Sequence, residues 1–418
     1  MMNLVEELKW RGLQYQITDP ELEKELNEGQ LTFYLGADPT ADSLHIGHLL
    51  AYLVAKRLEQ HGHRPILVIG GGTGLIGDPS FKENERQLLS IEESMTNADG
   101  IIRQVKQLLP NARIVNNYDW LSGLNAIEFL RDIGKHFNIS YMIAKESVKS
   151  RIETGLSFTE FAYQIIQAWD FEYLFANHHC QLQIGGQDQW GNITSGMELI
   201  RKIHGIQSKT YGFTFPLVTK ADGSKFGKSE SGNVWLDPVR TSPYEFYQFW
   251  INTADADVIS RLKQFTFLSV SEIEALERAL IDAPHERMAQ KILAQEVTTL
   301  VHGSDKYIEA KKISEALFSG EIHMLPASMI EMACKDLINL EIASAIDIVD
   351  ALIQAKIAPS KREARQLISS GAITLNGIKI TDVSYILEKK DAIEGIFYVI
   401  RKGKKSYSII RQLIESAS

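Results

Sequence analysis

The stretch from Phe33 to His48 constrains the fold of this chain more than any other. It begins with an apolar run through Leu35, passes through a turn of glycine, proline and aspartate, and enters an apolar helix that opens near Ser43 and runs to Leu58. A helix that follows a buried parallel strand points its free backbone N–H groups at the carboxyl edge of the sheet, where phosphates bind. The stretch therefore predicts an α/β nucleotide-binding domain.

Two histidines, His45 and His48, lie at the predicted start of this helix. Their spacing of three residues places both rings on one face. Gly47 between them removes a side chain where a nucleotide could approach the backbone. Two histidines near a helix start are equally well explained as surface residues, so the pair alone does not decide between these interpretations.

Length and charge set the broad class of the protein. A chain of 418 residues is long enough for two or three domains, each with its own core. From Lys356 to the end there are twelve Lys and Arg against six Asp and Glu, which gives a net charge of +6. Because the formal net charge of the whole chain is −9, the part before Lys356 carries −15. A polyanion would be attracted to the C-terminal segment, and nucleic acid is the natural candidate.

Several classes of protein are disfavoured by the sequence. No segment reaches the roughly 18 continuous apolar residues of a membrane span, and the acidic start lacks an apolar signal core, so we expect a cytoplasmic protein without membrane contact. The two cysteines, Cys180 and Cys334, form no CxxC pair, which argues against a disulfide framework or a structural zinc site. His178, His179 and Cys180 are adjacent, which is poor geometry for joint ligation, so we expect no protein metal site.

A glycine-rich segment follows a second expected strand, from Pro65 to Gly70. Gly72–Gly77 is a formal GxGxxG, the pattern of a dinucleotide site. That site needs a helix that continues past the last glycine, whereas Asp78, Pro79 and a charged stretch follow here. We therefore interpret the glycines as room for a ligand against the backbone. Asp78 would meet a cation such as an ammonium group, with a helix cap as the alternative.

Two pairs of basic residues are candidates for binding phosphate. Lys82 and Arg86 are four apart, so they project together on a helix; a solvated charged face is the ordinary interpretation and a phosphate clamp the functional one. The segment from Lys220 to Gly232 is rich in Gly and Ser, and it carries Lys225 and Lys228. A loop of this kind can supply positive charge where a transition state develops negative charge.

The segment from Ser157 to Phe171 predicts a buried helix with one polar stripe. Its apolar residues surround the helix, whereas Tyr163, Gln167 and Asp170 fall at i, i+4 and i+7. Polar groups on a buried face cost free energy unless they are paired, so these three either pair with one another or face a ligand. We favour the ligand.

The segment from Cys180 to Asn192 predicts a strand that ends in a pair of glycines. It delivers Asp188 and Gln189 to the carboxyl edge of the sheet, the usual side for groups that bind ligands. Asp188 suits a ribose diol, and Gln189 suits a substrate carboxylate. A turn-forming aspartate in the glycine loop is the alternative for Asp188.

The remaining patterns suggest the domain organisation. We expect a catalytic α/β domain over residues 1–220, with a helical insertion at about 90–152. The loop that carries Lys225 and Lys228, called the lysine loop below, and an α-helical domain would follow over 221–320. A linker over 321–350 and a basic domain over 351–418 would complete the chain. In the last, Ser360 caps a helix that carries Lys361, Arg362 and Arg365, and Asn376-Gly377 predicts a hairpin. A basic unit of this kind resembles an RNA-binding domain of ribosomal proteins.

Together these motifs resemble the bacterial-type tyrosyl-tRNA synthetases, a family of the class I aminoacyl-tRNA synthetases. The resemblance rests on HIGH at 45–48, GLIGDPS, the Tyr163 helix, GGQDQWGN and KFGKS, in the family's order along nearly the whole chain. It implies a Rossmann-like catalytic domain whose insertion makes a homodimer contact, a helical domain and a small α+β RNA-binding domain. It also implies activation of L-tyrosine with Mg-ATP, followed by transfer of tyrosine to tRNA(Tyr).

The resemblance also implies roles for individual residues. Those implied in catalysis by contact with the phosphates are Thr40, His45, His48, Lys82, Arg86, Lys225 and Lys228. Those implied in binding tyrosine are Tyr34, Asp78, Tyr163, Gln167, Asp170 and Gln189. Those implied in binding ATP are Gly36, Asp38, His45, Gly47, His48, Gly186, Asp188 and Lys228. The basic residues Lys361, Arg362 and Arg365 would contact RNA.

Departures from the family pattern and rival interpretations stay open at this point. Leu35 stands where a cysteine can reach the ribose, Gln187 where serine is frequent, and Phe226-Gly227 replaces Met-Ser of the usual KMSKS loop. The rivals are a tryptophanyl-type relative, a nicotinamide-dependent oxidoreductase using Gly72–Gly77, and a non-catalytic RNA-binding protein.

Overall fold

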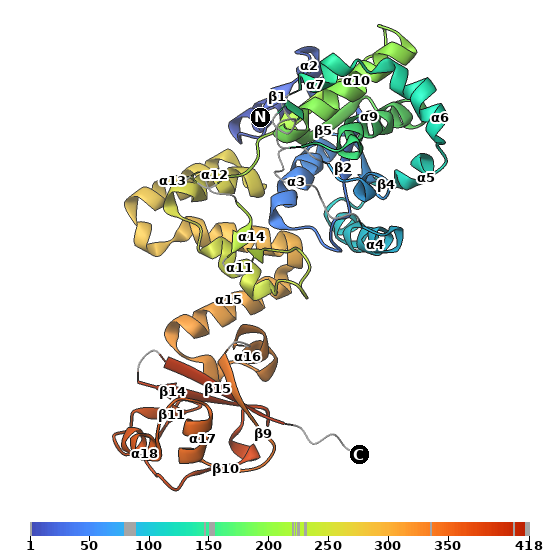
Figure 1. The fold of residues 1–418 in the computed structure, drawn as a ribbon. Helices are drawn as coiled ribbons and strands as arrows, with labels where there is room; N and C mark the ends of the chain where they lie inside the picture. Colours follow the sequence, from blue (N-terminus) through green and yellow to red (C-terminus); the bar gives the residue numbers. More distant parts are fainter. Residues whose placement is uncertain are drawn as a thin grey trace. The chain divides into compact units, whose positions relative to one another are not determined.

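The computed structural model describes most of the chain, which divides into two compact units (Figure 1). The described residues are 2–78, 89–145, 148–149, 155–219, 221, 223, 226–229, 232–334, 337–403 and 406–413, without the side chains of residues 228 and 229. Unit 1 comprises Met1–Thr241 and Asn252–Val297, and unit 2 comprises Ser242–Ile251 and Thr298–Ser418.

Unit 1 is built on a six-stranded sheet in the order β1-β6-β5-β2-β3-β4. Five strands are parallel, and only β1 runs antiparallel to its neighbour. The strands are β1 (Gln16–Ile17), β2 (Thr32–Ala37), β3 (Arg64–Ile69), β4 (Arg113–Asn116), β5 (Leu182–Gly186) and β6 (Tyr211–Phe215). In a parallel sheet with crossover helices both faces are covered, which is why β3 is a continuous apolar run (residues 65–69 are all buried). The predicted α/β class is confirmed.

Helices connect the strands of this sheet, and further helices of unit 1 follow it in the sequence (Figure 1). The longer ones are α1 (Leu4–Trp10), α2 (Glu21–Glu28), α3 (Ile46–Gln60), α4 (Ile91–Leu108), α9 (Phe158–His178), α10 (Trp190–His204), α12 (Asp255–Phe265), α13 (Val270–Asp282) and α14 (Met288–His302), whose last residues belong to unit 2. The short ones are η1 (Thr73–Leu75), α5 (Tyr118–Leu121), α6 (Ala126–Glu128), η2 (Phe129–Ile133), η3 (Gly134–His136), α7 (Ile139–Ile143), η4 (Gln187–Gln189) and η5 (Pro284–Glu286). The antiparallel pair β7 (Lys228–Ser229) and β8 (Gly232–Asn233) lies in the predicted lysine loop.

Two expected boundaries in unit 1 differ from the structure. Helix α3, whose start carries the HIGH sequence and which is called the signature helix below, begins at Ile46 rather than near Ser43. His45 is its N-cap. The expected insertion at about 90–152 starts too early, because β4 pairs in register with β3 and α4 precedes it as a crossover helix. The parallel pairing of residues 113–116 makes this part of the main sheet, so an insertion would begin only after residue 117.

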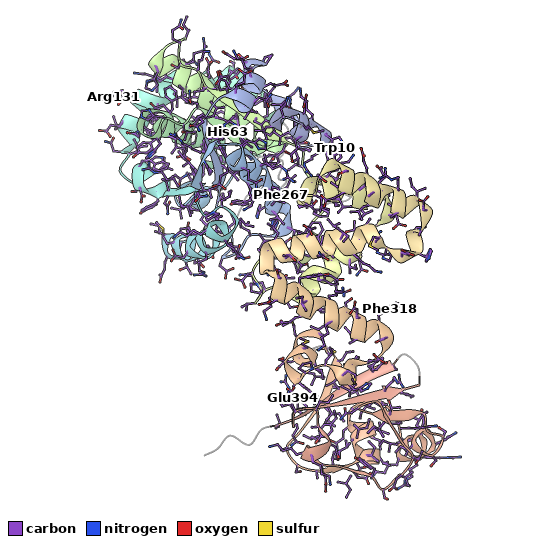
Figure 2. The ribbon with its side chains drawn as sticks, turned by 180° about the vertical axis from the view of Figure 1, so that it is seen from behind. Trp10, His63, Arg131, Phe267, Phe318 and Glu394 are labelled. Atoms are coloured by element: carbon purple, nitrogen blue, oxygen red, sulfur yellow. The ribbon has the colours of Figure 1, made fainter. Side chains whose placement is uncertain are left out.

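A buried arginine joins α3 to the helices that follow the lysine loop. The Arg57 guanidinium donates to the Thr266 carbonyl at 2.5 Å, and its carbon lies 4.4 Å from the Phe267 ring centroid. Its Nε lies 3.6 Å from the Glu7 carboxylate of α1. Burial lowers the pKa of Arg57 to about 9. Figure 2 labels Trp10 and Phe267, which mark this junction within unit 1.

Unit 2 contains a small mixed domain with its own core. Its helices are α11 (Pro243–Ile251), α15 (Ser304–Ser319), η6 (Ile322–Met324), α16 (Ala327–Cys334), α17 (Ile348–Gln354), α18 (Lys361–Ser369) and η8 (Lys389–Asp391). Its strands are β9 (Ile338–Ile342), β10 (Ile346–Asp347), β11 (Ile373–Leu375), β12 (Ile378–Ile380), β13 (Ile386–Leu387), β14 (Phe397–Lys402) and β15 (Ser406–Gln412). The sheets have the orders β12-β11-β14-β15-β9 and β10-β13.

The cap and hairpin expected in unit 2 agree with the structure, whereas the expected linker does not. Ser360 caps α18, and β11 and β12 form an antiparallel hairpin through Asn376 and Gly377, both with positive φ. Residues 321–350 were expected to be a linker, but they include α16 and β9. Strand β9 pairs in parallel with β15, and α16 contributes Ile330 to a core shared with that sheet. The long-range pairing of β9 has no local signal.

No helix among the described residues is both long and apolar enough to cross a membrane.

His63 predicts an acid-sensitive contribution to the stability of unit 1. Its ring is buried (Figure 2 labels the residue), Nδ1 accepts from the Leu31 N–H at 3.1 Å, and Nε2 lies 2.9 Å from the Leu26 carbonyl. This pairing requires a neutral ring, and burial lowers the pKa of His63 below its usual 6.5. The folded state therefore binds fewer protons than the unfolded state, and stability is lost as the pH falls below about 6.5.

We expect His63→Gln to lower the free energy of unfolding by about 1–3 kcal/mol at pH 7.5, because two buried backbone groups lose their partner. Between pH 7 and pH 5 the variant should lose less further stability than the wild type. Urea denaturation across this range measures both effects. Parallel pH dependence in the two proteins would contradict the assignment.

Candidate active site

The candidate site lies at the carboxyl edge of the unit 1 sheet. Tyr34 is in β2, Asp38 follows β2, the glycine turn η1 follows β3, and Gln189 follows β5. The pairing Tyr34↔Ile66 and Tyr34↔Gln183 fixes β2 between its neighbours. Because parallel strands end at a common edge, these segments meet although they are far apart in the sequence. Helix α9 contacts η1 and brings its polar stripe to the same edge.

One end of the site pairs a buried phenol with a buried carboxyl. Tyr34 is 2% exposed, and within the described part of the chain its hydroxyl makes no hydrogen bond. Burial, and then the charge of Asp170, raise the pKa of Tyr34. An unpaired buried hydroxyl costs about 1–3 kcal/mol, so a ligand that supplied a partner here would gain correspondingly.

Asp170 is held by two donors from the segment after β4. Its Oδ2 accepts from Asn117 Nδ2 at 2.9 Å, and its Oδ1 accepts from Trp120 Nε1 at 2.8 Å. The carboxyl is 3% exposed, and burial raises its pKa to about 7 despite these donors. Trp120 in turn stacks on Tyr173 of α9, with ring centroids 4.4 Å apart. The arrangement fixes a carboxyl that can accept a hydrogen bond from a ligand hydroxyl.

A network centred on Asp38 extends from this end. Tyr163 donates its hydroxyl to Asp38 Oδ2 at 2.9 Å, and Thr73 donates to Oδ1 at 2.7 Å. Thr73 also accepts from Asn117 Nδ2 at 2.9 Å. Burial, followed by the charges of Asp38 and Asp78, raises the pKa of Tyr163, so its phenol stays protonated and donates. Both Asp38 oxygens therefore orient other residues of the site.

Gln189 links the middle of the site. Its Nε2 donates to Asp78 Oδ2 at 2.7 Å and to Asp188 Oδ2 at 3.2 Å, and its Oε1 accepts from Gln167 Nε2 at 3.3 Å. Burial is the main cause of the raised pKa of Asp188, and the charge of Asp78 adds to it. The three carboxylates of Asp38, Asp78 and Asp188 give this region a negative potential that suits an ammonium group.

The two histidines lie at the start of α3 and stack on each other. Their ring centroids are 3.8 Å apart at an interplanar angle of 17°, and the Gly47 N–H donates to His45 Nδ1 at 3.1 Å. A Cβ at Gly47 would lie 2.8 Å from His45 Cε1. The glycine is thus needed for the histidine ring itself. His48 and Gly47 are exposed at a helix N-terminus, a geometry that favours phosphate.

The lysine loop meets the histidines through its backbone. Ile46 donates its N–H to the Val234 carbonyl at 3.0 Å, and Val234 donates to the Gly227 carbonyl at 3.1 Å. A Cβ built on Gly227 would lie 3.4 Å from the Gly47 nitrogen. The centre of the loop therefore lies directly against the start of α3.

Four of the predicted basic residues are not placed by the structure. Lys82, Arg86 and Lys225 lie outside the described residues, and only the backbone of Lys228 is described. Thr40 is exposed in the turn before α3, and its N–H donates to the Asp38 carbonyl at 2.8 Å. Gly36 and Gly186 lie in β2 and β5 at the same sheet edge. The Asp188 carboxylate lies so close to the Gly186 backbone that a Cβ there would clash with Asp188 Oδ1.

The sequence patterns above do not indicate three residues that orient Asp170 and Asp38, namely Thr73, Asn117 and Trp120. Asn117 directly follows β4, so the rule that found Asp188 and Gln189 would have found it, had residues 113–116 been assigned to the main sheet. Trp120 had no comparable signal. Asn192 was also missed; it donates to Gln189 Oε1 at 3.1 Å.

The structure does not favour the dinucleotide interpretation of Gly72–Gly77. After β3 the chain forms η1, a single 3₁₀ turn over Thr73–Leu75, rather than an α-helix. Within the residues described, the next helix along the chain is α4, which begins at Ile91. The fingerprint requires a helix that opens within the glycine motif.

Comparison with known proteins gives consistent matches over the chain. Residues 26–319 match the family model described as tRNA synthetases class I (W and Y), and residues 329–410 match the tyrosine–tRNA ligase C-terminal domain model. A tyrosine–tRNA ligase of Geobacillus stearothermophilus is 56% identical over 98% of this chain and 100% of its own length. One of Staphylococcus saprophyticus is 52% identical over 97% of this chain and 98% of its own.

A solved structure matches the fold as well. The C-terminally truncated mitochondrial tyrosyl-tRNA synthetase of Aspergillus nidulans is similar with a TM-score of 0.68 and 32% identity. The match covers 76% of this chain and 95% of that structure.

Asp170 predicts a titration that can be followed through its tryptophan partner. We expect wild-type tryptophan fluorescence to show a transition near pH 7 that is absent in Asp170→Asn and in the reporter control Trp120→Phe. Asn117→Ala removes a donor that favours the ionised carboxyl, so the midpoint should move to higher pH. A midpoint unchanged in Asn117→Ala would contradict the proposed role of that donor.

Proposed function

Since the chain belongs to the tyrosine–tRNA ligase family of the class I tRNA synthetases, we propose that it activates L-tyrosine with ATP and transfers the tyrosine to tRNA(Tyr). One observation carries the substrate assignment: the Tyr34 hydroxyl, which has no hydrogen-bond partner among the described residues, is buried within the field of the Asp170 carboxyl. A ligand phenol placed between them can accept from Tyr34 and donate to Asp170. Phenylalanine would give the Tyr34 hydroxyl no partner and the Asp170 carboxyl no donor beyond Asn117 and Trp120, at a cost of about 1–3 kcal/mol.

The other groups of tyrosine have partners in the same site. The ammonium group would be bound by Asp78, Tyr163 and Gln167, which the hydrogen bonds of Asp38 and Gln189 hold in place. Gln189 would lie near the carboxylate. Both oxygens of Asp38 accept within this network, which supports a role in holding Tyr163 rather than the contact with ATP that the resemblance implies.

The first reaction needs no protein nucleophile. The tyrosine carboxylate attacks the α-phosphate of Mg-ATP in line, and pyrophosphate leaves. Charge develops on the transferring phosphate, and positively charged and hydrogen-donating groups that are already in position stabilise it. For this role we assign Thr40, His45, His48, Lys82, Arg86, Lys225 and Lys228. Asp188 would bind the ribose, with Gly36, Gly47 and Gly186 giving the nucleotide access to the backbone.

In the second reaction the terminal adenosine of the tRNA attacks the tyrosyl-adenylate. The basic helix α18 would bind tRNA through phosphates: Lys361, Arg362 and Arg365 are exposed on it. Lys361 lies 2.7 Å from Asp350, so part of its charge is shared within the domain. We place the protein in the cytoplasm, where its tRNA substrate is used.

The function is tested by ATP–pyrophosphate exchange with tyrosine, tryptophan and phenylalanine. We expect exchange with tyrosine alone at matched concentrations. Tyr34→Phe should lower the preference for tyrosine over phenylalanine roughly 2- to 12-fold, the equivalent of one neutral hydrogen bond. Exchange with tryptophan but not tyrosine would favour the tryptophanyl alternative. No exchange with any amino acid would favour the non-catalytic RNA-binding alternative.

We further propose that the chain forms a homodimer through its insertion. Large apolar side chains are exposed there and at the start of α9: Ile127 (70%), Leu130, Ile139, Tyr141 and Phe158 (72%). Exposed apolar groups concentrated in one region mark interaction surfaces more often than isolated ones.

Sedimentation velocity tests the dimer contact. Ile127→Glu places a charge within the proposed interface and should shift the protein toward monomer at micromolar concentration. The matched control is Ile206→Glu, at a residue 79% exposed outside this region, which should remain dimeric. A monomeric wild type, or a dimer unaffected by Ile127→Glu, would contradict the proposal.

A further inference from the structure

Arg261 of α12 is buried beneath the lysine loop, and none of the roles proposed above involves it. It is 3% exposed, and its guanidinium carbon lies 4.6 Å from the centroid of the Phe226 ring. Phe226 also packs on Phe265 of α12, with ring centroids 5.5 Å apart. A planar guanidinium stacks well on an aromatic face, especially where water is excluded.

The same arginine holds the backbone at the base of the loop. It donates to the Thr219 carbonyl, and its other nitrogen donates to Gln264 Oε1 at 2.8 Å. Asp257, one turn earlier in α12, accepts from the Ala221 N–H at 3.0 Å and lies 3.4 Å from the Arg261 guanidinium. Arg261 and Asp257 thus fix the chain on both sides of residue 220.

The opposite side of Phe226-Gly227 is fixed by the signature helix. Gly227 has φ +98°, a conformation that favours glycine, and a Cβ at this position would lie in ordinary van der Waals contact with the Gly47 nitrogen, at 3.4 Å. The carbonyl of Gly227 is bound by Val234, whose own carbonyl is bound by Ile46. Residues 226–227 are therefore held between α12 and the start of α3.

We propose that Arg261 is a positioning residue for adenylate formation, which fixes the lysines of the loop through Phe226. Lys225 precedes Phe226, and Lys228 follows Gly227, so a displacement of these two residues displaces both ammonium groups. The inference rests on the proposed role of these lysines at the triphosphate. Arg261 itself is assigned no contact with either substrate; it acts where a small misplacement of a charged group lowers the rate of the chemical step.

A double-mutant cycle tests this inference by pre-steady-state measurement of tyrosyl-adenylate formation in the full chain. Lys228→Ala and Arg261→Gln should each slow the step by about tenfold or more, with the Kd for tyrosine unchanged within about twofold. In the Lys228→Ala background, Arg261→Gln should add less than about twofold, because it acts through the loop. The matched control Arg278→Gln, at an exposed arginine of α13, should keep the wild-type rate.

The outcomes separate this inference from the proposed function. A slow Lys228→Ala with a wild-type rate in Arg261→Gln, or fully additive losses, would overturn the inference alone. A wild-type rate in Lys228→Ala would overturn the role of the loop and the inference with it. If Arg261→Gln does not fold, Phe226→Leu replaces it in the cycle, because this variant keeps Arg261 and its backbone hydrogen bonds and removes the stacked ring. It should slow adenylation without weakening tyrosine binding.

Discussion

The parallel alignment of β2, β3, β4 and β5 is the constraint on which the rest of unit 1 depends. It brings the ends of four strands to one edge, so that residues more than 100 positions apart form hydrogen bonds there, such as Asp78 with Gln189 and Asp38 with Tyr163. Burial of the apolar strands and helices supplies most of the free energy of folding. The polar groups at the edge are therefore not needed for stability and can serve binding. The helix start at His45 lies at this same edge.

The site combines two electrostatic environments. At one end, the neutral donors Asn117 and Trp120 keep the buried Asp170 carboxyl in place, and burial raises its pKa to about 7. At the other end, the N-terminus of α3 presents backbone donors, and Gly227 of the loop lies beside Gly47. A molecule with a phenol, an ammonium group and an activated phosphate ester would match both ends together. Such a match would let one edge both select an amino acid and activate it.

Much of this could be predicted because the signals are local. The stripe of Tyr163, Gln167 and Asp170 follows from helical spacing, and the Asn376-Gly377 hairpin follows from turn chemistry. What failed depended on contacts distant in sequence: the place of β4 in the sheet, with Asn117 at its end, and the pairing of β9 with β15. The Arg261–Phe226 stack was not predicted either, because neither residue shows a pattern that distinguishes it from an ordinary core or surface residue.

The central claim is that a phenol pocket and a phosphate site converge on this edge, and a crystal structure with a nonhydrolysable tyrosyl-adenylate analogue tests it most directly. The account predicts the ligand's phenol oxygen within about 2.6–3.2 Å of both the Tyr34 hydroxyl and the Asp170 carboxyl, with its phosphate-equivalent group beside His45 and Gly47. A phenol bound away from Tyr34 and Asp170, or an adenosine directed away from the start of α3, would contradict it.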